Sequence, residues 1–168
     1  MPMDVQFEQG ETVIRDDSKV YPYVAVGGKT MAAVTDGGVL YTWGDNTYGQ
    51  LGIGLTSDAT PYSTTPTVAI NGNVKKVVVG DGFMVAVTIN GEVYAWGRNA
   101  NGQLGNNTIT TNDSIDNANN YNANSPKRVL ISYDGENMQN LDGIVNVNAG
   151  VNSSMAVGRD GYLYSWGS

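Results

Sequence analysis

The side chains available for chemistry are limited in kind, because the 168-residue sequence contains neither histidine nor cysteine. This removes histidine acid–base catalysis, cysteine nucleophiles and the usual zinc ligand sets. Two carboxylates could hydrolyse a glycosidic bond, but the only adjacent pair is Asp16 and Asp17. Adjacent residues of a strand point to opposite faces, so we expect both carboxylates to be solvated. The sequence therefore predicts a protein that is not an enzyme.

Metal and phosphate sites are not indicated either. Asp113 and Asp116 lie among asparagines, but they lack the Asp-x-[Asp/Asn]-x-[Asp/Asn]-Gly spacing of a calcium loop. The glycine pairs at 27–28 and 37–38 are not followed by the Lys-[Ser/Thr] of a phosphate-binding loop. These glycines fit hairpin turns and strand corners, and no cofactor is predicted.

The charge balance argues against nucleic acid and anionic membranes as partners. The chain carries 9 Lys and Arg against 16 Asp and Glu, a net charge of −7, whereas duplex binding needs clustered cations. The two basic pairs, at 75–76 and 127–128, are interpreted as solvated strand ends. No apolar run is long enough to span a bilayer, so membrane insertion is not expected.

Composition gives a limited indication of the compartment. The absence of cysteine fits a cytoplasmic protein or a surface protein of an organism that avoids disulfides. Residues 1–3 do not resemble the start of a signal peptide. The weakly charged, Asn- and Thr-rich character favours a secreted or cell-surface bacterial protein over a cytoplasmic one.

Three tryptophans mark the elements that would position any functional residue. Each belongs to a Tyr-x-Trp-Gly motif and lies 16 residues after a glycine; the pairs are Gly27 and Trp43, Gly80 and Trp96, and Gly150 and Trp166. Between these markers the three segments align without a gap. Each segment contains a Gly-Gly, Asn-Gly or Asp-Gly pair, which favours a tight hairpin. The spacing therefore predicts three equivalent pairs of antiparallel strands.

The second strand of each hairpin alternates between two faces. In the first segment Leu40 and Thr42 share one face, and Tyr41 and Trp43 share the other. Apolar or small residues on both faces indicate a sheet that is packed on both sides, as a propeller blade is. The small residues expected to allow close approach of neighbouring blades are Ala33, Ala86 and Ala156.

A second block follows the first two tryptophans and contains Gly-Gln-Leu-Gly at 49–52 and 102–105. A variable loop, a strand after a proline and a strand leading to the next glycine complete about four strands per unit. This ordered set resembles the repeat of the regulator-of-chromosome-condensation family over residues 24–168. The family often has a histidine after the first glycine, and no role of that side chain can be transferred to this chain.

The resemblance implies an all-β fold of β-propeller blades with about four antiparallel strands each. We expect one domain over 1–168, with its parts as follows: the tail of a preceding repeat at 1–23, repeats at 24–73 and 74–143, and a truncated repeat at 144–168. Seven blades are usual in the family, so the chain is an excerpt of a longer propeller, or its N-terminal strand completes the last blade of a ring. An open arc would expose blade faces, which predicts a homo-oligomer in which two copies form a six-bladed ring.

The predicted function is a non-catalytic protein-interaction scaffold with an unidentified protein partner. Loops on a rigid scaffold commonly carry recognition, and the candidate loops are 53–65 and 106–125; the longer one is also explained as a tolerated, solvent-exposed insertion. The candidate binding residues are Tyr48, Tyr62, Asn107, Asp113 and Tyr121. Two alternatives are guanine nucleotide exchange on a small GTPase, implied only by the family, and a cell-surface adhesion or glycan-binding module.

Overall fold

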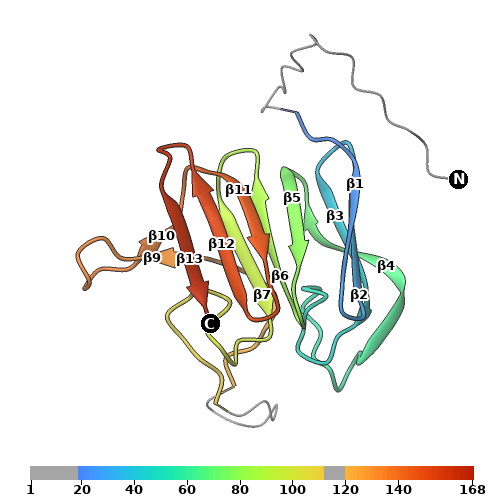
Figure 1. The fold of residues 1–168 in the computed structure, drawn as a ribbon. Coiled ribbons are helices and arrows are strands. Elements are labelled where there is room, and N and C mark those ends of the chain that lie inside the picture. The colour runs from blue at the N-terminus through green and yellow to red at the C-terminus, as the bar shows by residue number, and fades with distance from the viewer. Residues whose placement is uncertain (1–18, 112–119) are drawn as a thin grey trace, which may run out of the picture.

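The computed structural model describes residues 19–111 and 120–168. Apart from one short two-stranded sheet, their strands form three antiparallel sheets that stand side by side (Figure 1). Blade 1 contains β1 (Tyr23–Gly27), β2 (Thr30–Val34), β3 (Val39–Asp45) and β4 (Tyr62–Asn71). Blade 2 contains β5 (Val74–Val79), β6 (Phe83–Thr88), β7 (Val93–Gly97) and β8 (Ala123–Arg128). Blade 3 contains β11 (Ile144–Ala149), β12 (Ser153–Gly158) and β13 (Leu163–Gly167). The predicted all-β architecture of propeller blades is thereby confirmed.

The three tryptophans occupy equivalent places in these blades. Trp43 pairs with Met31, Trp96 with Met84 and Trp166 with Ser154 across the central hairpin of each sheet. The hairpin turn contains a glycine with φ between 74° and 86° in all three blades, a conformation that glycine adopts without steric cost. Glycine spacing and turn chemistry therefore set the same strand register three times.

Neighbouring blades meet through their first strands, because β5 contacts both β1 and β11. The Tyr23 hydroxyl of blade 1 donates to the Val77 carbonyl of blade 2 at 3.0 Å. Lys76 of blade 2 in turn donates to the Asn146 side chain of blade 3 at 2.7 Å. The blades are therefore successive members of one stack, with β4 and β8 at the opposite edges of their sheets.

Blade 2 forms the centre of the hydrophobic core, because it is covered on both faces. We call the face that carries the tryptophan the upstream face, since it meets the preceding blade, and the opposite face the downstream face. On blade 2, Met84 and Trp96 of the upstream face and Val85 and Val93 of the downstream face are all fully buried. Ala86 is also fully buried, which agrees with a small residue between closely packed sheets.

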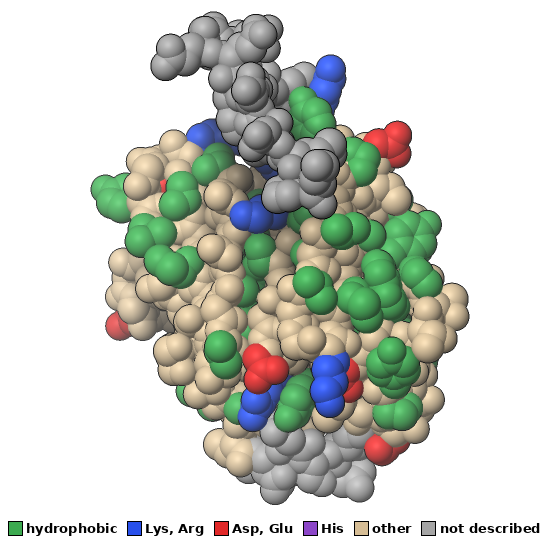
Figure 2. Space-filling view, turned by 45° about the vertical axis from the view of Figure 1, so that its right-hand side comes forward, with side chains coloured by type: hydrophobic (Ala, Val, Ile, Leu, Met, Phe, Trp, Pro, Cys, Tyr) green, Lys and Arg blue, Asp and Glu red, His purple; other side chains and the backbone are tan. Residues whose placement is uncertain are grey.

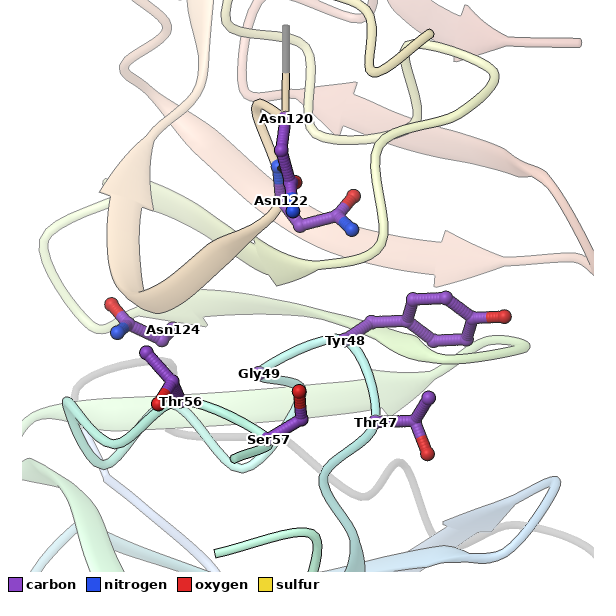
Figure 3. Close-up of a pocket in the computed structure, with 8 residues that line it drawn as sticks. All are labelled: Thr47, Tyr48, Gly49, Thr56, Ser57, Asn120, Asn122 and Asn124. Atoms are coloured by element: carbon purple, nitrogen blue, oxygen red, sulfur yellow. Dashed lines mark hydrogen bonds between the residues drawn. The ribbon is translucent and has the colours of Figure 1, made fainter. Parts of the chain in front are cut away.

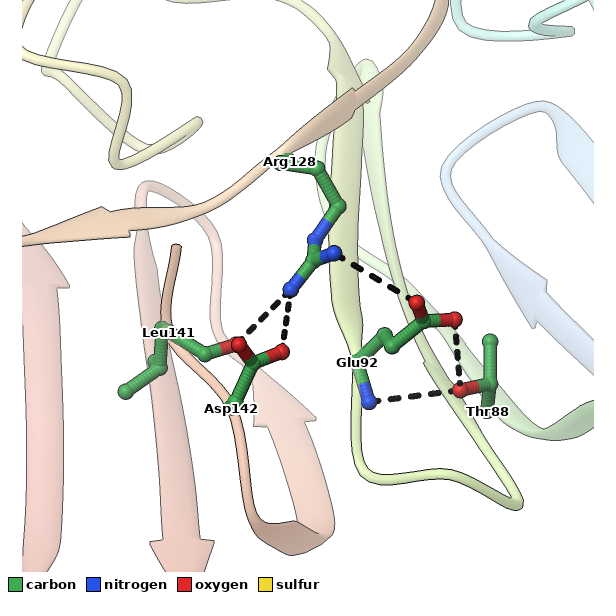
Figure 4. A network of polar contacts seen from close by, with 5 residues as sticks. All are labelled: Thr88, Glu92, Arg128, Leu141 and Asp142. Atoms are coloured by element: carbon green, nitrogen blue, oxygen red, sulfur yellow. Dashed lines mark hydrogen bonds and ion pairs between the residues drawn. The ribbon is translucent and has the colours of Figure 1, made fainter. Parts of the chain in front are cut away.

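The interpretation of residues 127–128 as a solvated strand end is wrong for Arg128. Its guanidinium donates to the Glu92 carboxylate at 3.5 Å and to the Asp142 carboxylate (Figure 4). It also lies 5.3 Å from the centre of the Tyr94 ring. Only 22% of the Arg128 side chain is exposed. The planar guanidinium can serve two carboxylates and an aromatic face at once, so Arg128 links blade 2 to the start of blade 3.

Two features were not expected from the sequence. A short sheet of β9 (Leu130–Ile131) and β10 (Gln139–Asn140) lies between blades 2 and 3 in the chain. Tyr62 begins β4 instead of lying in a loop.

Within residues 19–111 and 120–168, no helix is long and apolar enough to cross a membrane.

Candidate interaction surface

The loop that follows each tryptophan is held by one buried asparagine. The Asn46 side chain accepts from the Leu51 amide at 3.1 Å and donates to the Thr60 and Leu55 carbonyls at 2.8 and 3.2 Å. In blade 2, Asn99 accepts from the Leu104 amide at 3.2 Å. A buried side-chain amide whose oxygen and nitrogen are both hydrogen-bonded fixes the loop backbone. The variable part of each loop therefore begins from a rigidly held segment.

The glutamine of Gly-Gln-Leu-Gly is also buried, but its surroundings differ between blades. Gln50 accepts from the Tyr48 amide at 2.8 Å and donates to the Asp45 carboxylate at 3.0 Å. In blade 2 the residue equivalent to Asp45 is Arg98. The Gln103 amide nitrogen is buried there and has no hydrogen-bond partner among the described residues. Arg98 therefore does not bond to the glutamine of its own loop as Asp45 does, and its guanidinium is available for contacts outside that loop.

Arg98 uses this freedom to contact blade 1. Its guanidinium lies 4.8 Å from the centre of the Tyr48 ring and 4.0 Å from the Asp81 carboxylate. A cation above a partly exposed aromatic ring contributes about 0.5–1 kcal/mol. Tyr48 therefore lies at a junction between blades, half-buried, and does not project freely as a loop aromatic would.

The tryptophans connect each loop to the following blade. The Trp96 indole nitrogen donates to the Gln50 carbonyl of blade 1 at 2.9 Å, and Trp166 donates to the Gln103 carbonyl of blade 2 at 2.8 Å. A methyl group added at Gly52 would lie 2.6 Å from the Trp96 indole nitrogen. The last glycine of Gly-Gln-Leu-Gly is therefore the surface on which the next tryptophan rests.

The candidate loops of blades 1 and 2 meet at an open polar hollow of about 180 Å³ (Figure 3). The Gly54 amide donates to the Asn124 carbonyl at 2.8 Å, which joins the two loops through their backbones. The residues that line the hollow are Thr47, Tyr48, Gly49, Thr56, Ser57, Asn120, Asn122 and Asn124. None of these side chains is charged near neutral pH, so the hollow offers only hydroxyl, amide and aromatic groups.

The predicted binding residues are only partly brought together. Tyr48 lines the hollow, and Tyr121, which is 43% exposed, lies between two of its asparagines in the chain. Asn107 is exposed with φ 62°, and Tyr62 is 56% exposed at the start of β4. Asp113 lies outside the described residues. The hollow therefore unites Tyr48 with the neighbourhood of Tyr121, while Tyr62 and Asn107 do not line it.

Sequence reasoning missed Arg98, and it placed Ser57 and the three lining asparagines in candidate loops without singling out any of them. Arg98 had a detectable signal, because it replaces the acidic Asp45 at the same place in an otherwise repeated block. The asparagines had no such signal, since the loop that carries them differs in length and sequence from the corresponding loop of blade 1. The hollow is formed by contact between two loops of different length, which neither loop reveals alone.

The perturbed ionisable groups lie away from the hollow. Hydrogen bonds from Asn137 and Glu136 hold the pKa of Asp134 well below its ordinary range. Burial raises the pKa of the Tyr23 hydroxyl well above its ordinary value. In the described part of the chain, no group of three carboxylates lies close enough to hold a metal ion.

Successive antiparallel blades, in which a tryptophan of one blade bonds to the loop of the blade before it, define a β-propeller repeat protein. Family comparison agrees: models of the regulator of chromosome condensation (RCC1) repeat match residues 23–50 and 74–103, and a second RCC1 repeat model matches 37–87 and 90–157. The chain belongs to the RCC1 repeat family.

Curated relatives carry similar repeats within longer proteins. The chain is 35% identical over 139 residues to the ultraviolet-B receptor UVR8 of Arabidopsis thaliana, covering 82% of this chain and 27% of the receptor. It is 33% identical over 150 residues to the human E3 ubiquitin-protein ligase HERC2, covering 86% of this chain and 3% of the ligase. The chain thus spans about a quarter or less of these relatives.

Solved structures show the same fold. Human WBSCR16 superposes with a TM-score of 0.66 at 26% identity, covering 86% of this chain and 33% of that protein. Yeast RCC1 (Prp20), in its complex with Kap60, gives a TM-score of 0.67 at 24% identity, covering 86% of this chain and 31% of Prp20. The latter likeness supports the fold alone.

Proposed function

We propose that this chain is a non-catalytic binding module that docks a folded protein on the joined loops of blades 1 and 2. The observation that carries this proposal is the backbone bond between Gly54 and Asn124, which makes one surface from two repeats. Buried Asn46 and Asn99 hold the loops in place before a partner arrives. Such preorganisation lowers the entropic cost of association.

The size and chemistry of the hollow favour a protein over a small molecule. Pockets that enclose drug-sized ligands usually measure about 300–1,000 Å³, whereas this hollow measures about 180 Å³. Aromatic residues and arginine are enriched in protein interfaces, and Tyr48, Arg98 and Tyr121 supply them here.

Capture of partners from extracts of the source cells tests the proposal. The chain with Ser57→Arg places a long cation in the hollow, and Tyr121→Ala removes an exposed ring. Thr65→Arg is the matched control, because Thr65 is exposed on β4 and does not line the hollow. We expect the same partner to be lost by the first two variants and kept by the control. A partner retained equally by all three variants would contradict the proposal.

The rival functions are separated by two direct assays. Guanine nucleotide exchange predicts that the chain accelerates release of a fluorescent nucleotide from a small GTPase, and we expect no acceleration. Glycan binding predicts signals on a glycan array that disappear with Ser57→Arg, and we expect none. Exchange activity or a glycan signal of this kind would replace protein docking as the function.

A further inference from the structure

The Asn-Gly pairs of the chain lie at 71–72, 90–91 and 101–102. An asparagine before glycine readily loses its side-chain amide, because glycine has no side chain to hinder attack of its backbone nitrogen on the asparagine side chain. The first two pairs also share the preceding isoleucine, so both read Ile-Asn-Gly. The structure around each pair therefore determines which asparagine reacts.

Two of the three pairs lie in closed turns. The Gly91 amide donates to the Thr88 carbonyl at 3.0 Å, and the Gly102 amide donates to the Asn99 carbonyl at 3.2 Å. A methyl group added at Gly91 would also lie 3.0 Å from the Ile144 backbone nitrogen. The attacking nitrogen of these pairs is thus held in a turn, and the turn must open before the nitrogen can react.

The pair at 71–72 has neither restraint. The Gly72 amide donates no hydrogen bond to a described residue. Apart from its chain neighbours, no atom of the described residues lies within 4 Å of a methyl group added at Gly72. Asn71 is exposed and forms the last pair of the β3–β4 ladder, with Val39. Because the ends of a ladder open at little cost in free energy, both reacting groups are accessible in the folded chain.

We propose that Asn71 is a modification site of the folded protein, at which its side-chain amide is converted to an acid. The Gly72 nitrogen attacks the side-chain carbonyl carbon of Asn71, and the new C–N bond closes a succinimide ring. The bond from that carbon to the side-chain nitrogen breaks, and this nitrogen leaves as ammonia with the proton of the Gly72 amide. Water then opens the ring at either carbonyl, which gives aspartate or isoaspartate.

The modification is confined to the covalent link between blades 1 and 2. Directly after this link the Val74 amide donates to the Gly38 carbonyl at 3.0 Å, and the Asn73 carbonyl accepts from the Ile89 amide at 2.9 Å. These bonds anchor the start of blade 2, so we expect the blades to stay packed when residue 71 changes.

The product carries one more negative charge than the unmodified chain, whose net charge is −7. The molecule is sparsely charged, since Lys, Arg, Asp and Glu make up 15% of its residues. Figure 2 shows correspondingly few charged side chains on the face that it draws. We therefore expect anion-exchange chromatography to separate the modified form.

Incubation of the full chain in mildly alkaline buffer, followed by peptide mapping with mass spectrometry, tests the proposal. Asn90 is the matched internal control, because it belongs to the same Ile-Asn-Gly sequence. In the folded chain we expect Asn71 to react about tenfold faster than Asn90, the protection given by one hydrogen bond. In urea the two rates should be equal. Equal rates in the folded chain, or a faster reaction at Asn90, would overturn the proposal.

Two variants assign the acidic form to its residue. Asn71→Gln should remove this form, because glutamine must close a larger ring and reacts more slowly, whereas Asn90→Gln should leave it unchanged. A methyltransferase specific for isoaspartate, supplied with labelled S-adenosylmethionine, should label the aged chain and the Asn90→Gln variant in the peptide that contains residue 71. Persistence of the acidic form in Asn71→Gln together with its loss in Asn90→Gln would contradict the assignment.

Discussion

The indole nitrogen of Trp96 lies 2.9 Å from the carbonyl oxygen of Gln50, although the two residues belong to different blades. Trp166 and Gln103 repeat this relationship at 2.8 Å. A side chain of one repeat thus satisfies the backbone of the repeat before it. The stability of such an array depends on the interfaces between neighbouring units as well as on each unit. This bond occurs at both interfaces between described blades.

Replacing Trp96 by Phe should destabilise the protein by about 2–4 kcal/mol, through a cavity and an unsatisfied buried carbonyl. Trp43→Phe is the matched control. Trp43 is half-buried and donates no hydrogen bond to a described residue, so its replacement should cost less than about 1 kcal/mol. Urea unfolding at low protein concentration measures both values. Equal losses would show that the bond to Gln50 is not what distinguishes the two tryptophans.

Gly52→Ala should lower the free energy of unfolding by more than the conformational cost of replacing a glycine. Gly52 has φ 66°, where alanine costs about 1–2 kcal/mol, and the new methyl group would meet the Trp96 indole at 2.6 Å. Gly135 has φ 80° with no atom within 4 Å of the added methyl, so Gly135→Ala reports the conformational cost by itself. We expect Gly52→Ala to exceed it by about 1–3 kcal/mol. Similar unfolding midpoints for the two variants would remove the steric argument.

Asn46→Asp should make stability depend on acid pH. The substitution removes the two donors to Thr60 and Leu55 and directs a carboxylate at their carbonyls, which should raise the carboxyl pKa in the folded state. A raised folded pKa means that stability is lost as pH rises above the unfolded value of about 3.9. We expect a loss of about 3 kcal/mol at pH 7 and a smaller loss at pH 3.

The exposed Asn107 provides the control for this substitution. Asn107→Asp adds the same carboxylate where it remains solvated, so thermal unfolding at pH 3 and pH 7 should differ from the unmodified chain by similar small amounts. If Asn46→Asp lowered the free energy of unfolding equally at pH 3 and pH 7, the new carboxylate would not lie against the two carbonyls, and the prediction would be wrong.

Tyr23→Phe should reduce the sensitivity of the fold to alkali. Burial raises the pKa of the Tyr23 hydroxyl, which donates to the Val77 carbonyl. Its stabilisation is therefore complete below the ordinary pKa of about 10 and is lost as pH rises above that value. At pH 8 the variant should lose about 1 kcal/mol, and this difference should shrink above pH 10. Tyr21→Phe, at a 51% exposed position, should follow the unmodified chain at both pH values.

The blades were predictable because their signals are local and repeated. The strand register follows from the glycine turns and from the constant spacing of the tryptophan. The packing of each sheet on both sides follows from the alternation of residues on strands such as 39–45. The contacts between blades were not predictable in the same way. Trp96 bonds to the backbone carbonyl of residue 50, and any residue type at that position has this carbonyl. Only the glycine at 52, which gives the indole room, indicates the close approach in the sequence.

Long-range side-chain contacts were the other part that sequence reasoning could not supply. Arg128 meets Glu92 and Asp142, which are 36 and 14 residues away, so neither pair has a fixed spacing to recognise. The hollow beside Tyr48 likewise depends on loops that differ in length between repeats. Both features follow from how blades stack, which the pattern within one blade does not determine.

Hydrogen exchange of the three indole N–H groups, followed by nitrogen-15 NMR at low protein concentration, tests blade clamping most directly. The sequence contains three tryptophans, so each signal reports one blade. Trp96 and Trp166 should exchange slowly, because their N–H groups are bonded to Gln50 and Gln103, and Trp43 should exchange fast. Equal protection of all three indoles, or fast exchange at Trp96, would contradict the account.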